Sequence, residues 1–424
     1  MHFPPRALRI PVKDNLRMNF FGRAERPLHR LIALLPLLLG VTGPAHAAPF
    51  TPTADSEVVE RLPLTSDPSA RQLESLRRQL ANRPGDNALR LDIGRRYFSL
   101  AMAQGDPRLV GYAAAAIAPL AVPSANSADY WLLQGQLKQF SHQFEPALTS
   151  LAKASQLDSK TPEPLAWRAA IFMVQARYAE AKAECQHLAA VATPLLAAGC
   201  QTYVQAAMGE LKPGFDALES AIKTAVASKP TPAPELLLWA YTRLAEMAIR
   251  LQQPGVAEAA FKSALKLGVI DQFLLGAYAD FLLANQRPAE VIKLLAGWER
   301  SDILLLRLAL AGKLTDDGRA NDWTNQLRDR FQAAAQRGDR LHEQEAARFE
   351  LDLERNPGKA LTAASSNYTV QKEPRDAEIL MRAALAARQS KAAQPALDWL
   401  RTSRYEDPAL DKIAVQLAAQ GATR

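Results

Sequence analysis

The sequence predicts an all-α protein, a solenoid of about eight helix-turn-helix pairs that becomes more irregular in its C-terminal third. The first observation is a step of 34 residues at which Gly135, Ala147, Leu151 and Ala154 recur as Ala169, Ala181, Cys185 and Leu188. A second set has the same internal offsets, namely Ala245, Ala257, Phe261 and Ala264, with Ala279, Val291 and Leu295 one step later. A repeat of this length is typical of stacked helix pairs.

Composition and proline placement are the second and third observations. Glycine accounts for only 20 of the 424 residues, helix-favouring residues are abundant, and no stretch alternates polar with β-branched or aromatic residues. Many of the 28 prolines stand where a helix is expected to begin, where their missing N–H costs nothing. Examples are Pro146, Pro162, Pro194, Pro288 and Pro408.

The repeated small residues allow the two helices of a pair to pack closely. They lie at the eighth position of the first helix (helix A) and near the start of the second (helix B), where they let the two backbones approach closely. A large apolar residue four positions later fills the seam. One pair cannot bury both of its faces, so we expect stability to require several neighbouring pairs.

The N-terminus predicts a signal peptide over residues 1–47. Arg23, Arg26 and Arg30 precede the apolar run 31–41, and Ala45-His46-Ala47 has the small-x-small form that precedes signal-peptidase cleavage. The run is shorter than the roughly 20 residues of a membrane-spanning helix. We therefore expect cleavage after Ala47 and a periplasmic or secreted protein with no transmembrane segment in its mature chain, and Met18 is an alternative translation start.

Most of the formal charge of +7 belongs to this leader, which holds seven basic and two acidic residues. The rest of the chain has 44 basic and 42 acidic residues, a net charge of +2. A dense basic stripe interleaved with aromatic residues is absent from the sequence, so we expect no nucleic-acid partner.

The elements after the leader follow in order. Residues 48–67 are rich in Pro, Thr, Ser and acidic residues and indicate a flexible tether. From Pro68 an amphipathic helix is expected to cap the array, and a regular array of pairs is expected over 68–300. Its pairs begin near residues 87, 129, 162, 194, 235 and 271, and the run Lys229–Pro234 interrupts it. Residues 301–424 are expected to form degenerate pairs of unequal helix length.

With these spacings the chain resembles tetratricopeptide-repeat (TPR) proteins, and with its leader it looks like an exported member of that family. The resemblance implies binding of a protein or peptide by the concave surface, which helix A positions line. Those positions correspond here to Asp129, Leu132, Gln136, Gln139, Phe140, Glu163, Met173, Trp239, Thr242, Glu246 and Arg250. Their mixed amide, apolar and sparsely charged character suits an extended peptide or a partner helix.

Two further features stand out against this background. The connector 104–112 is long for a helix-helix turn, so Asp106, Arg108 and Tyr112 are candidates for a ligand-facing loop, or for an insertion packed on itself. Cys185 and Cys200, the only cysteines, are expected to form a disulfide in an oxidising compartment, with two buried thiols as the alternative.

The sequence offers no catalytic, cofactor or metal motif. Only three histidines follow the leader, His142, His187 and His342, in three separate pairs. We therefore expect a non-catalytic scaffold or adaptor that binds an envelope protein or peptide. The alternatives are a superhelical cell-wall glycan-processing enzyme or its regulator, and a small-molecule or lipid carrier. The oligomeric state stays open.

Overall fold

The computed structural model describes residues 68–122 and 124–422, so the predicted signal peptide and tether lie outside the described residues. Residues Leu76–Arg424 belong to one compact unit, which carries every contact described below, while the first turns of α1 belong to a second unit. Over the described ranges the regular elements are all helices. None of these helices is both long enough and apolar enough to cross a membrane.

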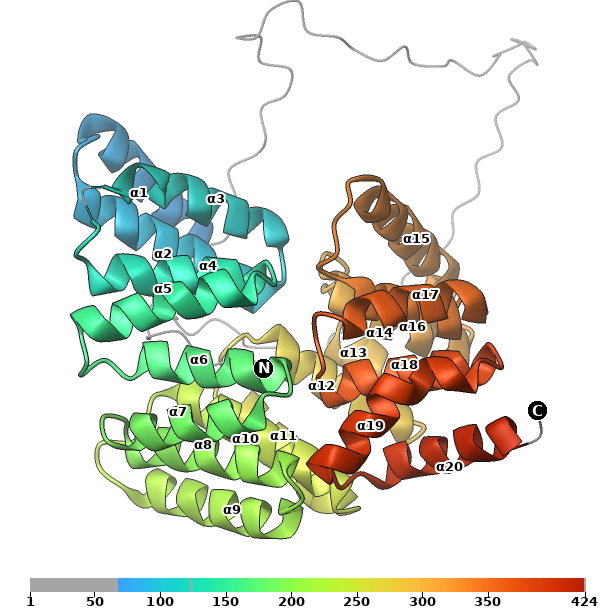
Figure 1. Ribbon diagram of the computed structural model, residues 1–424. Coiled ribbons are helices and arrows are strands. Elements are labelled where there is room, and N and C mark those ends of the chain that lie inside the picture. The colour runs from blue at the N-terminus through green and yellow to red at the C-terminus, as the bar shows by residue number, and fades with distance from the viewer. Residues whose placement is uncertain (1–67, 123, 423–424) are drawn as a thin grey trace, which may run out of the picture. The chain divides into compact units, whose positions relative to one another are not determined.

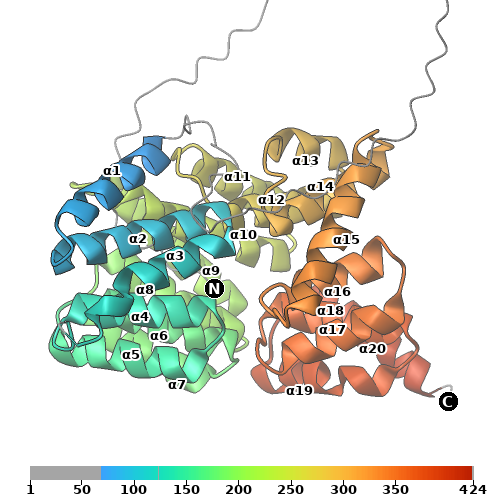
Figure 2. The same cartoon turned by 90° about the horizontal axis from the view of Figure 1, so that it is seen from above.

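The helices follow one another as antiparallel pairs (Figures 1 and 2). Their bounds are α1 Pro68–Asn82, α2 Asn87–Gln104, α3 Pro107–Ile117, α4 Ala128–Phe140, α5 Phe144–Leu157, α6 Glu163–Val174, α7 Tyr178–Ala189, α8 Pro194–Ala207, α9 Leu211–Ala227, α10 Pro234–Arg250, α11 Pro254–Leu265, α12 Gln272–Ala284, α13 Pro288–Leu294, α14 Asp302–Thr315, α15 Ala320–Gln336, α16 Glu343–Asp352, α17 Pro357–Tyr368, α18 Pro374–Ala386, α19 Gln394–Ser403 and α20 Pro408–Ala422. From α2 to α19 they form nine pairs in the described chain, where the sequence predicted about eight.

The seams of the pairs are built as the sequence predicts. A methyl group added at Gly135 would lie 2.5 Å from the Leu151 side chain, so only a small residue allows this approach of α4 to α5. Ala147 and Leu151 are fully buried, as are Ala169 and Ala181 one step later. Each pair therefore buries its internal face by close helix-helix packing.

The turns between helix A and helix B share one backbone feature in all nine pairs. Each turn contains one residue with positive φ, in chain order Gly105, His142, Ala176, Gly209, Gln252, Gln286, Asp316, Arg355 and Arg388. Only two of these are glycines, although a non-glycine residue costs energy in this region. The turn geometry thus continues through the C-terminal third, where the sequence register is lost.

The structure corrects the prediction of a long connector over residues 104–112. Helix α2 extends to Gln104, and α3 begins at Pro107, so Arg108 and Tyr112 lie on a helix and not in a ligand-facing loop. Asp106 is the N-cap residue of α3, since its carboxylate accepts a hydrogen bond from the backbone N–H of Arg108 at 3.0 Å. The dipeptide Asp106-Pro107 is therefore a helix start, and only Gly105 and Asp106 separate α2 from α3.

Candidate interaction surface

The predicted groove positions on α4 lie between neighbouring pairs. Asp129 forms an ion pair with Arg95 of α2 at 2.5 Å. Leu132 and Gln136 are buried, and Phe140 is half-buried. The ring of Phe140 lines an open pocket of about 380 Å³ together with residues of α3 and Leu341. At this end of the array, Phe140 is the predicted apolar position that lines an open pocket.

The predicted positions on α6 and α10 are more enclosed. Trp239 is buried, and a methyl group at Gly199 would overlap its ring, so α10 packs against α8 there. The Thr242 hydroxyl donates to the Leu238 carbonyl at 2.8 Å. Glu246 pairs with Arg243 at 2.8 Å, and Glu163 is half-buried at the start of α6. Trp239 therefore serves the packing between pairs, while Thr242 and Glu246 form their contacts within α10.

Arg250, at the end of α10, contacts a segment more than 150 residues away. We call Arg404–Asp407, between α19 and α20, the return segment. The Arg250 guanidinium donates to the Glu406 carbonyl at 2.8 Å and to the Ala206 carbonyl at 2.7 Å. It also lies 3.7 Å from the centroid of the Tyr405 ring, a cation–π contact. Met173 lines the same small interior space with Tyr203 and Tyr405.

Four further contacts join this C-terminal part of the chain to pairs three and four. The Trp399 indole N–H donates to the Tyr178 hydroxyl at 2.8 Å. The backbone N–H of Lys372 donates to the Val174 carbonyl at 2.7 Å. The backbone N–H of Leu211 donates to a Glu406 carboxylate oxygen at 3.4 Å. Gly209 faces Arg404 so closely that a methyl group there would lie 2.9 Å from the Arg404 Cβ.

An open pocket of about 690 Å³ lies along this junction. Leu211, Leu251 and Gln252 line it from the α8–α11 side, and Leu400 and Asp411 line it from α19 and α20. Part of the predicted concave surface is therefore covered by the chain's own C-terminal helices, and the covering is incomplete at the pocket.

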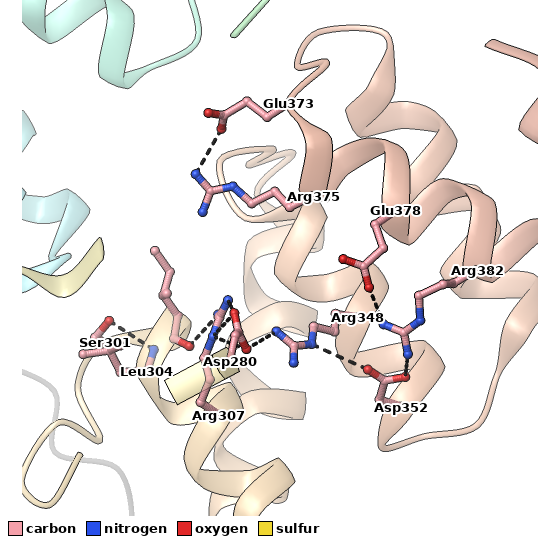
Figure 3. Close-up of polar contacts among 11 residues, drawn as sticks. Asp280, Ser301, Leu304, Arg307, Arg348, Asp352, Glu373, Arg375, Glu378 and Arg382 are labelled. Carbon is pink, nitrogen blue, oxygen red and sulfur yellow. Dashed lines mark hydrogen bonds and ion pairs between the residues drawn. The ribbon is translucent and has the colours of Figure 1, made fainter. Parts of the chain in front are cut away.

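The helix A faces of the C-terminal pairs carry a row of alternating charges that the sequence reading missed. We call it the charge ladder (Figure 3), and its members are Arg307, Asp280, Arg348, Asp352, Arg382 and Glu378. Asp280 accepts from Arg307 at 2.6 Å and from Arg348 at 2.7 Å. One sequence signal for the charge ladder was available. Residues four apart share a helix face, and this spacing separates the oppositely charged residues Arg348 and Asp352, as well as Glu378 and Arg382.

The ladder sets the charge of its carboxyl groups. Burial would raise the pKa of Asp280, but the positive charges of Arg307 and Arg348 outweigh it and lower that pKa to about 2. Burial raises the pKa of Glu378 at the other end of the ladder. Asp280 is therefore an anion at any physiological pH and holds two arginines from α14 and α16.

The two cysteines are paired. Cys185 of α7 and Cys200 of α8 form a disulfide with their Cα atoms 5.5 Å apart, closing a 15-residue separation between pairs three and four. Over the described residues, no cluster of three or more His, Cys, Asp or Glu side chains is arranged to hold a metal ion.

The comparisons with known proteins concern the fold alone. No protein-family model and no curated protein matches the chain. Solved structures similar to it include the APC/C heterotetramer Cut9–Hcn1 (17% identity, 74% of this chain and 52% of that one, TM-score 0.36). A Rap protein complexed with competence and sporulation factor is 13% identical, with 83% of this chain and 99% of that one covered and a TM-score of 0.43. Yeast Tom70 is 10% identical, with 84% of this chain and 85% of that one covered and a TM-score of 0.39. The chain spans about half the length of the first of these.

The class of the protein follows from its own helices. Nine stacked pairs, seams closed by small residues and a repeated turn geometry define a TPR-like α-solenoid.

Proposed function

We propose that the chain is a non-catalytic scaffold or adaptor of the cell envelope, exported through a signal peptide that is cleaved after Ala47. It binds a protein or peptide partner along the concave helix A surface. One observation carries the proposal: this surface already holds a polypeptide segment, since Arg250 binds the main-chain carbonyl of Glu406 and stacks on Tyr405. A surface that holds one non-helical segment by such contacts is chemically suited to hold another.

The open end of the surface lies at α3 and α4, where Phe140 borders the 380 Å³ pocket. Apolar and aromatic side chains beside a few polar groups are typical of sites that anchor a partner side chain. The net charge of +2 beyond the leader predicts little long-range steering, so binding should depend weakly on salt.

Affinity capture from envelope extract tests the binding surface. We expect Phe140→Glu to lose a partner that the unmodified chain captures, because a charge replaces an apolar anchor. The matched control is Val226→Glu, an apolar-to-acidic change at an exposed position on helix B of pair four. If both variants lose the partner, or if neither does, the proposal that Phe140 lies in the binding surface is contradicted. Turnover of a cell-wall glycan by the purified chain would contradict the proposal that the protein is non-catalytic.

Export is tested separately. N-terminal sequencing of the protein recovered from the periplasm or medium should give a chain that begins at Ala48. Recovery of the protein in the cytoplasm with residues 31–41 intact would refute both the cleavage and the location.

A further inference from the structure

The return segment meets pairs three to five in the way a separate peptide would. It has no regular secondary structure between α19 and α20. Its contacts there use the Tyr405 ring, the Glu406 carbonyl and the Glu406 carboxylate, with Arg250 and the Leu211 N–H as partners. None of these contacts requires the segment to be covalently part of the same chain.

The receiving side has one contact that does not involve the segment. With the segment docked, Arg250 is 8% exposed, and its second hydrogen bond, to the Ala206 carbonyl at the end of α8, holds the guanidinium group against α8. The turn residue Gly209, with φ of +85°, allows the close approach of Arg404. An arginine that is held by a second hydrogen bond presents a flat cation suited to an aromatic face and a carbonyl oxygen.

The junction also has features that favour exchange. Arg404 is a non-glycine residue with a positive φ of 54°, so its docked conformation carries backbone strain. The 690 Å³ pocket runs beside the return segment, and incoming chain has room there to contact Leu211 and Leu251 before the segment leaves. Departure of the segment would expose Arg250, and a replacement must satisfy the same groups.

We propose that the return segment is an internal ligand of the concave surface, and that the partner carries an extended segment of the same chemistry, an aromatic residue followed by an acidic one. This inference rests on the proposed function and names the partner class. Binding of the partner and docking of the return segment exclude each other, so the docked form is the closed state of the protein.

The test uses a labelled synthetic peptide of residues 401–410, RTSRYEDPAL, and fluorescence anisotropy with the full chain. In the closed chain the internal segment competes at an effective concentration on the order of millimolar. We expect Tyr405→Ala to release it and to bind the peptide at least about tenfold more tightly than the unmodified chain. Adding Arg250→Ala to this variant should abolish binding of the peptide.

The matched control is Arg319→Ala in the same Tyr405→Ala background. Arg319 is also stacked on an aromatic ring, 4.6 Å from Trp323, and is ion-paired with Asp317, but it lies in pair seven. Peptide binding should survive this change. A peptide in which alanine replaces the tyrosine should not bind any of these variants. Absence of peptide binding to a helical Tyr405→Ala chain, or binding that Arg250→Ala leaves intact, overturns the proposal.

A measurement on the unmodified chain decides the matter if Tyr405→Ala does not fold. Millimolar peptide should accelerate amide hydrogen exchange in α19 and α20, because those helices are released, while the exchange of α4 and α5 stays unchanged. Unchanged exchange in α19 and α20 overturns the proposal. A concentration-dependent dimer that the peptide dissociates would assign the site to a second copy of the chain, and would also overturn it.

This result is independent of the envelope-capture experiment. If Phe140→Glu loses the envelope partner while the peptide fails to bind, the proposed function stands and the internal-ligand inference falls. If the peptide binds while capture is unaffected by Phe140→Glu, the junction is a binding site and the surface at α4 is not the one used.

Discussion

Gly209→Ala is the sharpest perturbation of the closed state, because Gly209 combines two constraints. Its φ of +85° costs a residue with a side chain about 1 kcal/mol. Its missing methyl group would lie 2.9 Å from the Arg404 Cβ and 3.1 Å from the Arg404 carbonyl oxygen. Both contacts are too short, so the return segment must move, and overpacking of this kind costs about 1–3 kcal/mol.

Gly297 provides a control with almost the same backbone. Its φ is +86°, yet a methyl group added there would meet nothing within 4 Å. Gly297→Ala should therefore carry the backbone cost alone. The difference between the two variants, about 1–3 kcal/mol, measures the docking of the C-terminal helices.

Amide hydrogen exchange of α19 and α20 is the appropriate assay, because global unfolding of a repeat array need not be two-state. In Gly209→Ala these helices should exchange roughly 10-fold to 100-fold faster, while in Gly297→Ala they should keep the exchange of the unmodified chain. Equal exchange of α19 and α20 in the two variants would refute the reasoning that Gly209 is required for docking.

Three other predictions follow from the site. Asp280→Asn should leave its two arginines without their anion and destabilise the chain by about 1–2 kcal/mol after solvent screening, measured by chemical denaturation. The pKa of Asp280 is about 2 in the folded chain and near 3.9 in the unfolded chain. The stabilisation by the Asp280 carboxylate should therefore persist above pH 4 and be lost as the pH falls toward 2. If the unmodified chain and Asp280→Asn lost stability identically on acidification, this pH dependence would be contradicted. Burial, with the nearby His342, lowers the pKa of His142 to about 4 against about 6.5 unfolded, so stability should fall by on the order of 2 kcal/mol between pH 7 and 4.5, and His142→Gln should flatten that dependence. Intact mass should show a chain lighter by two hydrogens before reduction, and reduction of Cys185–Cys200 should lower the free energy of unfolding by about 3 kcal/mol; an unchanged mass would contradict the pairing.

The sequence predicted the local architecture because local architecture depends on neighbouring residues. The 34-residue step identified the small positions, and Gly135 indeed lies against Leu151 at the seam of α4 and α5. Prolines marked the first turns of many helices, and Pro107 would have marked α3 had its N-cap Asp106 been recognised. By contrast, the shared turn geometry gave no sequence signal, since His142 and Ala176 adopt a conformation that usually indicates glycine.

The sequence by itself determined an all-α solenoid and the seams within its pairs, since each depends on residues a few turns apart. It left Cys185 and Cys200 open between a disulfide and two buried thiols, and the structure pairs them. The tertiary structure alone decided which parts of the concave surface are open. Contacts such as Trp399 with Tyr178, 221 residues apart, depend on the orientation accumulated over many stacked pairs, which no local pattern encodes. The same accumulation brings Tyr405 onto Arg250 and aligns the charge ladder across α12 to α18.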